Sequence, residues 1–195
     1  MVINAVVEGA SDLGVAHALI IASGHEVGAG YAKRGKSRLD PDIAKYARAA
    51  RYEHGRAWLV LRDSDGACPV QLRRSLLSSF SEPAPESFLL RIVHTMSEGW
   101  FLGDPDGVAA YFRVPRAKLP VAPEDVEDPK RFLLQLSLQH SPRAFQKQFV
   151  REDVSPGPEF TTLINDFARH HWDIVGAAKK VPSLQRALDR LQLLH

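Results

Sequence analysis

Acidic residues follow three apolar runs of this sequence. The runs and the acids behind them are residues 2–7 with Glu8, residues 58–61 with Asp63 and Asp65, and residues 88–93 with Glu98. Apolar runs of this length that stop at a turn signal are typical of strands buried on both faces of a parallel sheet. The acids are therefore expected just beyond the carboxyl ends of such strands, where open α/β sheets place their ligands.

Carboxylates that share one edge of a sheet repel each other unless a cation lies between them. Asp63 and Asp65 are two residues apart, so a regular strand would place both side chains on the same side. Asp12 lies in the expected first turn of the helix after Glu8. Oxygen-rich sites of this kind suit Mg²⁺ or Mn²⁺. The predicted metal ligands are Glu8, Asp12, Asp63, Asp65 and Glu98.

The same acids also have a purely structural interpretation. Asp, Ser and Gly are common in turns, so residues 63–66 could form a plain exit from the strand. Asp12 could be a helix-capping residue. Cys68 follows this turn, and a small residue near a helix start explains it better than a reactive thiol. Both interpretations of the acids stay open at this level.

A basic segment follows the first predicted helix and could contact nucleic-acid phosphates. Its bases are Lys33, Arg34, Lys36 and Arg38. Residues 30–37 also match the Walker A pattern, which requires a strong strand before its first glycine and a helix that begins at Lys-Ser. Here the preceding residues form a weak strand, and Pro41 predicts that the next helix begins at Asp40. Nucleotide binding by residues 30–37 and a merely solvated loop remain alternatives.

The order of the predicted elements indicates an α/β fold with a mostly parallel sheet flanked by helices. Strand and helix patterns alternate through residues 1–112, which we interpret as the core domain. Three prolines then interrupt the chain, and residues 113–195 are predicted to form a helical C-terminal extension. This extension begins with a helix near residues 128–138 and continues with two or three more. It could pack on or beside the core, or mediate association into a homo-oligomer.

Composition narrows the functional classes. The 195 residues are 45% hydrophobic and 25% charged, as in ordinary soluble globular proteins, and the net charge of +2 offers no general attraction to nucleic acid. The single cysteine excludes an internal disulfide and fits a reducing cytoplasm. No apolar run approaches the ~20 residues of a membrane span, and the N-terminus lacks a secretory signal pattern. A cytoplasmic protein without a membrane segment is expected.

The three acidic segments, taken in order, resemble the TOPRIM domain. Type IA and type II topoisomerases, bacterial primases and OLD-family nucleases share this domain, in which Glu-Gly closes the first strand and Asp-x-Asp closes a later one. The sequence Val-Glu-Gly-Ala-Ser-Asp at residues 7–12 is similar to the opening of the OLD type. Residues 98–105 are similar to a segment of bacterial TOPRIM-like proteins, some of them encoded beside ABC-type ATPases in presumed anti-phage loci.

The resemblance implies a Mg²⁺-dependent nuclease acting on DNA or RNA, as the effector of a two-component defence system with an ABC-type ATPase partner. Glu8 would be a general base or metal ligand, and Asp63 and Asp65 would be ligands. Ala67 departs from the pattern, because primases and topoisomerases often have a third acid there, and Glu98 could replace it. No tyrosine nucleophile of topoisomerase type can be assigned. A non-catalytic module, whose helical tail docks a partner, is the remaining alternative.

Overall fold

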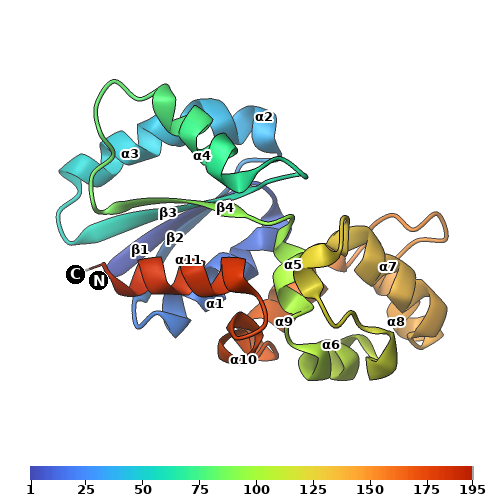
Figure 1. The fold of residues 1–195 in the computed structure, drawn as a ribbon. Coiled ribbons are helices and arrows are strands. Elements are labelled where there is room, and N and C mark those ends of the chain that lie inside the picture. Colours follow the sequence, from blue (N-terminus) through green and yellow to red (C-terminus); the bar gives the residue numbers. More distant parts are fainter. Residues whose placement is uncertain (195) are drawn as a thin grey trace.

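Four parallel strands form one sheet in the computed structural model, which describes residues 1–194 (Figure 1). The strand order is β2-β1-β3-β4, and every neighbouring pair is parallel. Helices cover both faces, so the predicted α/β class is confirmed. The strands are β1 (Val2–Val7), β2 (Glu26–Ala32), β3 (Arg56–Asp63) and β4 (Phe88–Val93).

The two central strands alternate their side chains between two cores. Leu59 and Leu61 of β3 point into one hydrophobic cluster, whereas Trp58 and Val60 point into the other. This is the period of two that extended backbone imposes. Because both faces are buried, β1 and β3 read as continuous apolar runs in the sequence. The edge strand β2 is largely exposed and rich in glycine, which explains its weak sequence signal.

Helices form a layer on each side of the sheet (Figure 1). One layer contains α1 and α11, which contact β1 and β4 respectively, and α9, which packs on α1. The other layer contains α3 and α4. The bounds of these helices are α1 (Leu13–Ala22), α9 (Phe160–His170), α11 (Pro182–Gln192), α3 (Ile43–Tyr52) and α4 (Pro69–Ser78).

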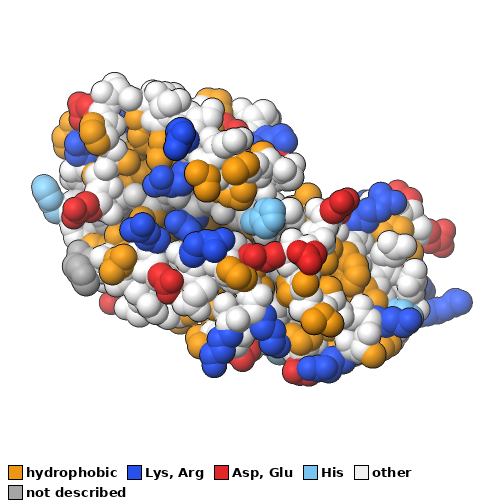
Figure 2. Space-filling view, in the orientation of Figure 1, with side chains coloured by type: hydrophobic (Ala, Val, Ile, Leu, Met, Phe, Trp, Pro, Cys, Tyr) orange, Lys and Arg blue, Asp and Glu red, His pale blue; other side chains and the backbone are white. Residues whose placement is uncertain are grey.

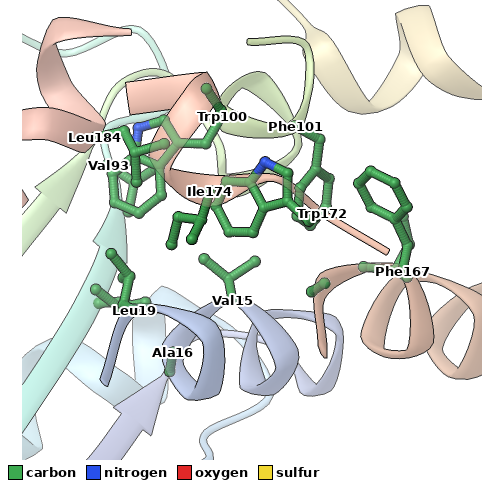
Figure 3. Packing of buried hydrophobic residues seen from close by; sticks show 14 of the residues in the cluster. Val15, Ala16, Leu19, Val93, Trp100, Phe101, Phe167, Trp172, Ile174 and Leu184 are labelled. Atoms are coloured by element: carbon green, nitrogen blue, oxygen red, sulfur yellow. The ribbon is translucent and has the colours of Figure 1, made fainter. Parts of the chain in front are cut away.

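The remaining helices lie mostly beyond the carboxyl edge of the sheet (Figure 1). They share one core with the sheet, because Trp100, Phe101 and Trp172 pack over Val15 of α1 (Figure 3). The indole Nε1 of Trp100 donates to the buried Ser183 Oγ at 2.8 Å. These helices are α5 (Ser97–Phe101), α6 (Pro105–Phe112), α7 (Pro129–His140), α8 (Arg143–Phe149) and α10 (Ile174–Ala178), with 3₁₀ turns η3 (Arg116–Lys118) and η4 (Pro123–Asp125).

Two sequence predictions about helices are corrected. The chain turns helical at α2 (Lys36–Leu39), not at Asp40, and continues through the 3₁₀ turn η2 (Asp40–Asp42) into α3. Pro41 therefore sits inside a run of helical turns rather than at its start. Residues 142–194 form four helices instead of two or three, because irregular segments separate short helical stretches. Within residues 1–194 no helix has the length and apolar content needed to cross a bilayer.

Gly28→Ala is expected to destabilise the fold by about 2 kcal/mol, as overpacking of a tight site does. The register of β1 and β2 shifts by a residue between Ile3 and Ala5, and the Asn4 side chain fills this bulge by accepting the Ala29 N–H at 2.9 Å. A Cβ at position 28 would lie 2.4 Å from Asn4 Oδ1.

The matched control is Gly30→Ala on the same strand, whose Cβ would meet only the end of the flexible Leu13 side chain at 3.0 Å. Chemical denaturation of the two variants provides the comparison. Equal loss of stability in both would contradict the role assigned to the bulge.

Candidate functional site

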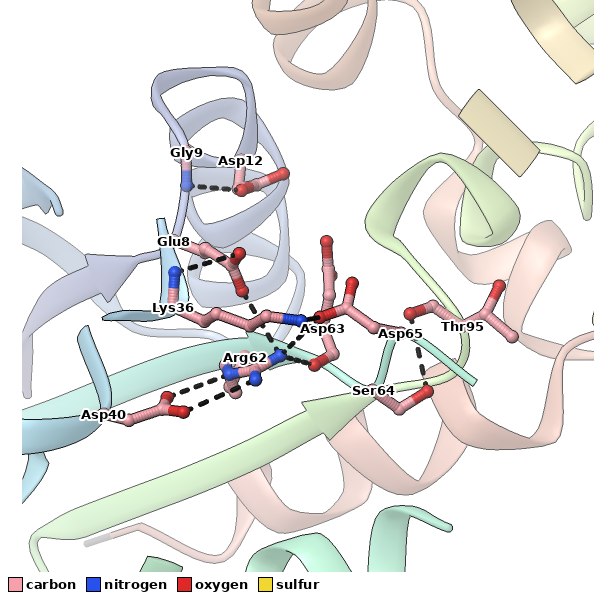
Figure 4. A network of polar contacts seen from close by, with 10 residues as sticks. All are labelled: Glu8, Gly9, Asp12, Lys36, Asp40, Arg62, Asp63, Ser64, Asp65 and Thr95. Atoms are coloured by element: carbon pink, nitrogen blue, oxygen red, sulfur yellow. Dashed lines mark hydrogen bonds and ion pairs between the residues drawn. The ribbon is translucent and has the colours of Figure 1, made fainter. Parts of the chain in front are cut away.

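Four predicted acids are brought to the carboxyl edge of the two central strands (Figure 4). Glu8 directly follows β1, and Asp63 is the last residue of β3. The two strands are adjacent, with Val6 in register with Val60, so both acids leave the sheet at the same edge. Asp12 ends the 3₁₀ turn η1 (Ala10–Asp12) that follows Glu8. The fourth acid is Asp65.

The Asp63 carboxylate is the least compensated charge of this group. Within residues 1–194 it has no hydrogen bond and no ion pair, although the side chain keeps part of its surface open to solvent. Burial and the carboxylates of Asp12, Glu98 and Glu8 raise the pKa of Asp63 well above its usual range. Like charges held near one another favour the protonated form, and a nearby cation would reverse this effect.

Asp12 connects the exit of β1 to the start of α5. Its Oδ2 accepts the Gly9 N–H at 2.9 Å, and its Oδ1 accepts the Ser97 hydroxyl at 2.6 Å. The side chain is buried. Both interpretations of this residue are therefore compatible with the contacts, because it stabilises a turn and also adds negative charge beside Asp63.

Glu98 is fully buried behind the edge, and its negative charge is compensated by the ammonium group of Lys130 of α7. The Lys130 Nζ lies 3.1 Å from Glu98 Oε1, and neither Glu98 oxygen accepts a well-formed hydrogen bond within the described chain. Burial raises the pKa of Glu98 despite this lysine. Burial alone would lower the pKa of Lys130, but the carboxylates of Glu98, Asp12 and Asp63 raise it.

Arg62 organises a second set of contacts at the same edge (Figure 4). Only 4% of this residue is exposed, and its guanidinium forms three ion pairs. Nε lies 2.9 Å from Asp40 Oδ1, whereas Nη1 lies 3.1 Å from Asp65 Oδ2 and 3.4 Å from Glu8 Oε2. Lys36 Nζ also contacts Asp65 Oδ2 at 2.8 Å. This network neutralises part of the acidic edge with residues of the chain itself.

Asp65 is not part of the regular strand that was predicted to place its side chain on the same side as that of Asp63. β3 ends at Asp63, and Asp65 has a positive φ of 49°, so the alternation of a regular strand does not extend to it. Burial raises the pKa of Asp65, but Lys36 and Arg62 outweigh this effect and lower it overall. The two aspartates therefore have opposite electrostatic surroundings.

Glu8 lies between the two sets of acids. Its Oε1 accepts the backbone N–H of Lys36 at 3.1 Å, whereas the buried Oε2 accepts no hydrogen bond within residues 1–194. Burial raises the pKa of Glu8, Arg62 opposes this, and Asp65 and Asp12 add to it. A carboxylate with a raised pKa is better matched to proton transfer near neutral pH.

The donor chemistry of the edge fits a hard divalent cation, but the side chains are not preassembled around one. Carboxylate oxygens without hydrogen-bond donors remain on Glu8 and Glu98, and Mg²⁺ and Mn²⁺ prefer such oxygens. Yet no three His, Cys, Asp or Glu side chains of residues 1–194 are arranged to hold a metal ion. Binding of a cation would therefore require the side chains to move relative to one another.

The predicted phosphate-binding segment is only partly available. Lys33 pairs with Asp42, which raises the pKa of Lys33, and Lys36 pairs with Asp65. Arg34 and Arg38 are exposed and form no ion pair within the described chain. Half of the predicted basic set is therefore engaged by neighbouring acids.

The Walker A match does not form an open phosphate cradle. Gly30 lies inside β2, where it pairs with Ala5, and the next two residues also pair with β1. The backbone N–H groups of Lys33 and Gly35 donate to the carbonyls of Val7 and Glu8 at 3.0 Å. Because these amides are already bonded within the chain, we do not propose nucleotide binding at residues 30–37.

Arg62, Asp40 and Lys130 are site residues that the sequence analysis did not identify. A signal existed for Arg62, because a charged residue inside a strand buried on both faces requires a partner. Asp40 was interpreted only as a helix start, and Lys130 had no local signal.

Comparisons of the chain with protein-family models, with curated proteins and with solved structures gave no match.

Proposed function

We propose that this chain is a nuclease of TOPRIM type that hydrolyses phosphodiester bonds with bound Mg²⁺ or Mn²⁺. The observation that carries the proposal is the Asp63 carboxylate, which is partly open to solvent and has no partner within residues 1–194. The negative charges of Asp12, Glu98 and Glu8 act on it and raise its pKa. Such a concentration of negative charge at the ligand-binding edge of a parallel sheet favours cation binding.

Asp63, Glu8 and Asp12 are the residues that we expect to hold the cation. When bound, a divalent cation polarises a phosphoryl oxygen and lowers the pKa of a bound water. Glu8 has a raised pKa and is the candidate general base. Asp65 forms ion pairs with Lys36 and Arg62. We therefore propose that Asp65 positions the ammonium group of Lys36 and the guanidinium group of Arg62. Glu98 and Lys130 set the charge behind the site.

Lys36 is the candidate for direct contact with the scissile phosphate. Its side chain is 56% exposed, and it extends from the start of α2 toward the acidic edge. A phosphate could replace Asp65 as the partner of this ammonium group, since both offer anionic oxygens. The exposed Arg34 and Arg38 lie on the same segment and could contact neighbouring phosphates.

One observation favours a second candidate, a non-catalytic interaction module. The acids are not preassembled around a cation within residues 1–194, and Asp12 and Asp65 have structural contacts of their own. In that case the edge would be a stabilised turn region that docks a partner. The ABC-type ATPase partner is proposed from the resemblance of the motifs alone, so the first test uses the isolated chain.

The test is a cleavage assay with single-stranded and duplex DNA and RNA in millimolar Mg²⁺ or Mn²⁺, with EDTA as the control. Cleavage products are expected with either cation and not with EDTA. Calorimetric titration with Mn²⁺ accompanies the assay. Absence of both cleavage and Mn²⁺ binding would reject the nuclease and leave the interaction module.

A further inference from the structure

Four arginines from three elements gather along the outer edge of β4. Figure 2 shows Lys and Arg side chains concentrated over this edge, between α4 and α11. No ion pair joins any of the four to an acid within residues 1–194, and the acid of α11, Asp189, accepts a hydrogen bond from Gln185 instead. We call this set the arginine edge, and its members are Arg73, Arg91, Arg186 and Arg190.

Arg91 lies at the centre of the arginine edge. Its Nε is buried and has no acceptor within the described chain. Burial, followed by the charges of Arg73, Arg190 and Arg186, lowers the pKa of Arg91 to about 10. Arg73 is held to the strand, because its Nε donates to the Leu90 carbonyl at 3.4 Å. A buried donor without an acceptor among like charges is unfavourable unless an anion binds there.

We propose that the arginine edge binds the phosphate backbone of a nucleic acid and leads it to the acidic edge of the sheet. This inference rests on the proposed nuclease function and deepens it by naming the path of the substrate. Guanidinium groups match phosphate oxygens in a bidentate geometry, which makes a phosphodiester backbone a suitable anion.

The location of Arg91 favours nucleic acid over an acidic protein segment. Asp63 pairs in register with Val93, and Arg91 lies two residues before Val93 on β4. Two strand residues span about 7 Å. This corresponds to roughly two nucleotide steps of a duplex at ~3.4 Å per step. A backbone held by Arg91 would therefore reach the carboxylates within a few nucleotides.

The like charge of this edge argues against pairing of β4 with a second copy of itself. Two copies would bring eight guanidinium groups together without compensating acids. Charged residues on an edge strand are a common protection against such pairing. The inferred path also differs from the segment at residues 33–38, where Lys33 and Lys36 are already paired with acids.

The test measures binding of fluorescein-labelled DNA, single-stranded and duplex, by anisotropy in EDTA, so that cleavage cannot interfere. The test variant carries Arg73→Ala, Arg186→Ala and Arg190→Ala, which are exposed positions, and leaves Arg91 in place. The control variant carries Arg143→Ala, Lys147→Ala and Arg151→Ala, which remove the same charge from exposed positions on and just after α8. Thermal denaturation confirms that both variants fold.

The test variant is expected to bind about 10- to 100-fold more weakly, and the slope of log affinity against log salt should fall by about three. The control variant should keep the affinity within about threefold. Equal losses in both variants, no loss in the test variant, or no binding by the native chain would overturn the inference. Equally strong competition by polyglutamate would overturn it in favour of an acidic protein partner.

The failure of this inference can be distinguished from failure of the proposed function. Binding in EDTA depends on the arginine edge and needs no cation, whereas cleavage needs both a cation and the carboxylates. Binding of DNA in EDTA, together with absence of both cleavage and Mn²⁺ binding, would support the arginine edge and reject the nuclease. Cleavage that survives in full in the arginine variant would support the nuclease and overturn the inferred path.

Discussion

Asp63→Asn is expected to abolish Mg²⁺-dependent cleavage and, at the same time, to stabilise the metal-free protein. Asparagine keeps the size of the side chain and removes the negative charge that the carboxylates of Asp12, Glu98 and Glu8 repel. Loss of about 3 kcal/mol of cation-assisted stabilisation in the transition state would slow cleavage by more than about 100-fold. Relief of about 1 kcal/mol of repulsion would raise the Tm by about 2–4 °C.

The gain in stability should depend on pH in a defined direction. Folding raises the pKa of Asp63 above the value of about 3.9 expected in the unfolded chain. The stabilisation linked to its protonation is therefore complete below about pH 4 and is lost as the pH rises through the folded-state pKa. The advantage of Asp63→Asn in the metal-free protein should be largest at neutral pH and should shrink as the pH falls.

Asp125→Asn is the control for this variant, because Asp125 is exposed and lies far along the chain in η4. Cleavage rates in Mg²⁺ and melting curves in EDTA across a pH series provide the measurements. A variant at position 63 that cleaves at the native rate would remove Asp63 from the site. A variant that is less stable than the native chain at neutral pH would contradict the charge repulsion.

Arg62→Met is expected to destabilise the protein by about 3–5 kcal/mol, as loss of one partner from a buried ion pair does. The guanidinium is nearly inaccessible and contacts Asp40, Asp65 and Glu8. Methionine fills much of the same space but leaves these carboxylates without their shared cation. For a chain of this length the Tm should fall by roughly 6–20 °C.

Millimolar Mg²⁺ should recover part of this loss in the Arg62→Met variant. Glu8 and Asp65 would then have free oxygens for a cation, and any ligand that binds only the folded state raises its stability. Melting curves with Mg²⁺ and with EDTA test this, with Arg51→Met as the control. Arg51 and its partner Glu82 are both exposed, so that variant should change stability by less than about 1 kcal/mol. Equal Mg²⁺ stabilisation of native and variant chains would contradict a competition between Arg62 and the cation.

Local sequence patterns determined the α/β architecture and the edge at which the acids gather. Apolar runs such as residues 58–61, which stop at a turn signal, are typical of strands buried on both faces, and parallel strands bring their carboxyl ends to one edge. The sequence therefore predicts that Glu8 and Asp63 lie at the same edge, as the register of β1 and β3 places them. The edge strand β2 gave only a weak signal, because it is exposed and rich in glycine. The helix start at Lys36 was missed, because a helix as short as α2 carries little periodicity.

Only the tertiary structure decided which charges meet. Arg62 reaches Asp40 across 22 positions of the chain, Lys130 reaches Glu98 from another helix, and Arg91 meets arginines of α4 and α11. The periodicity of a strand or helix follows from backbone geometry within that element, so sequence reveals it. Whether a charge is compensated depends on how distant elements pack. A chain with the same local sequence patterns and a different packing would pair these charges differently.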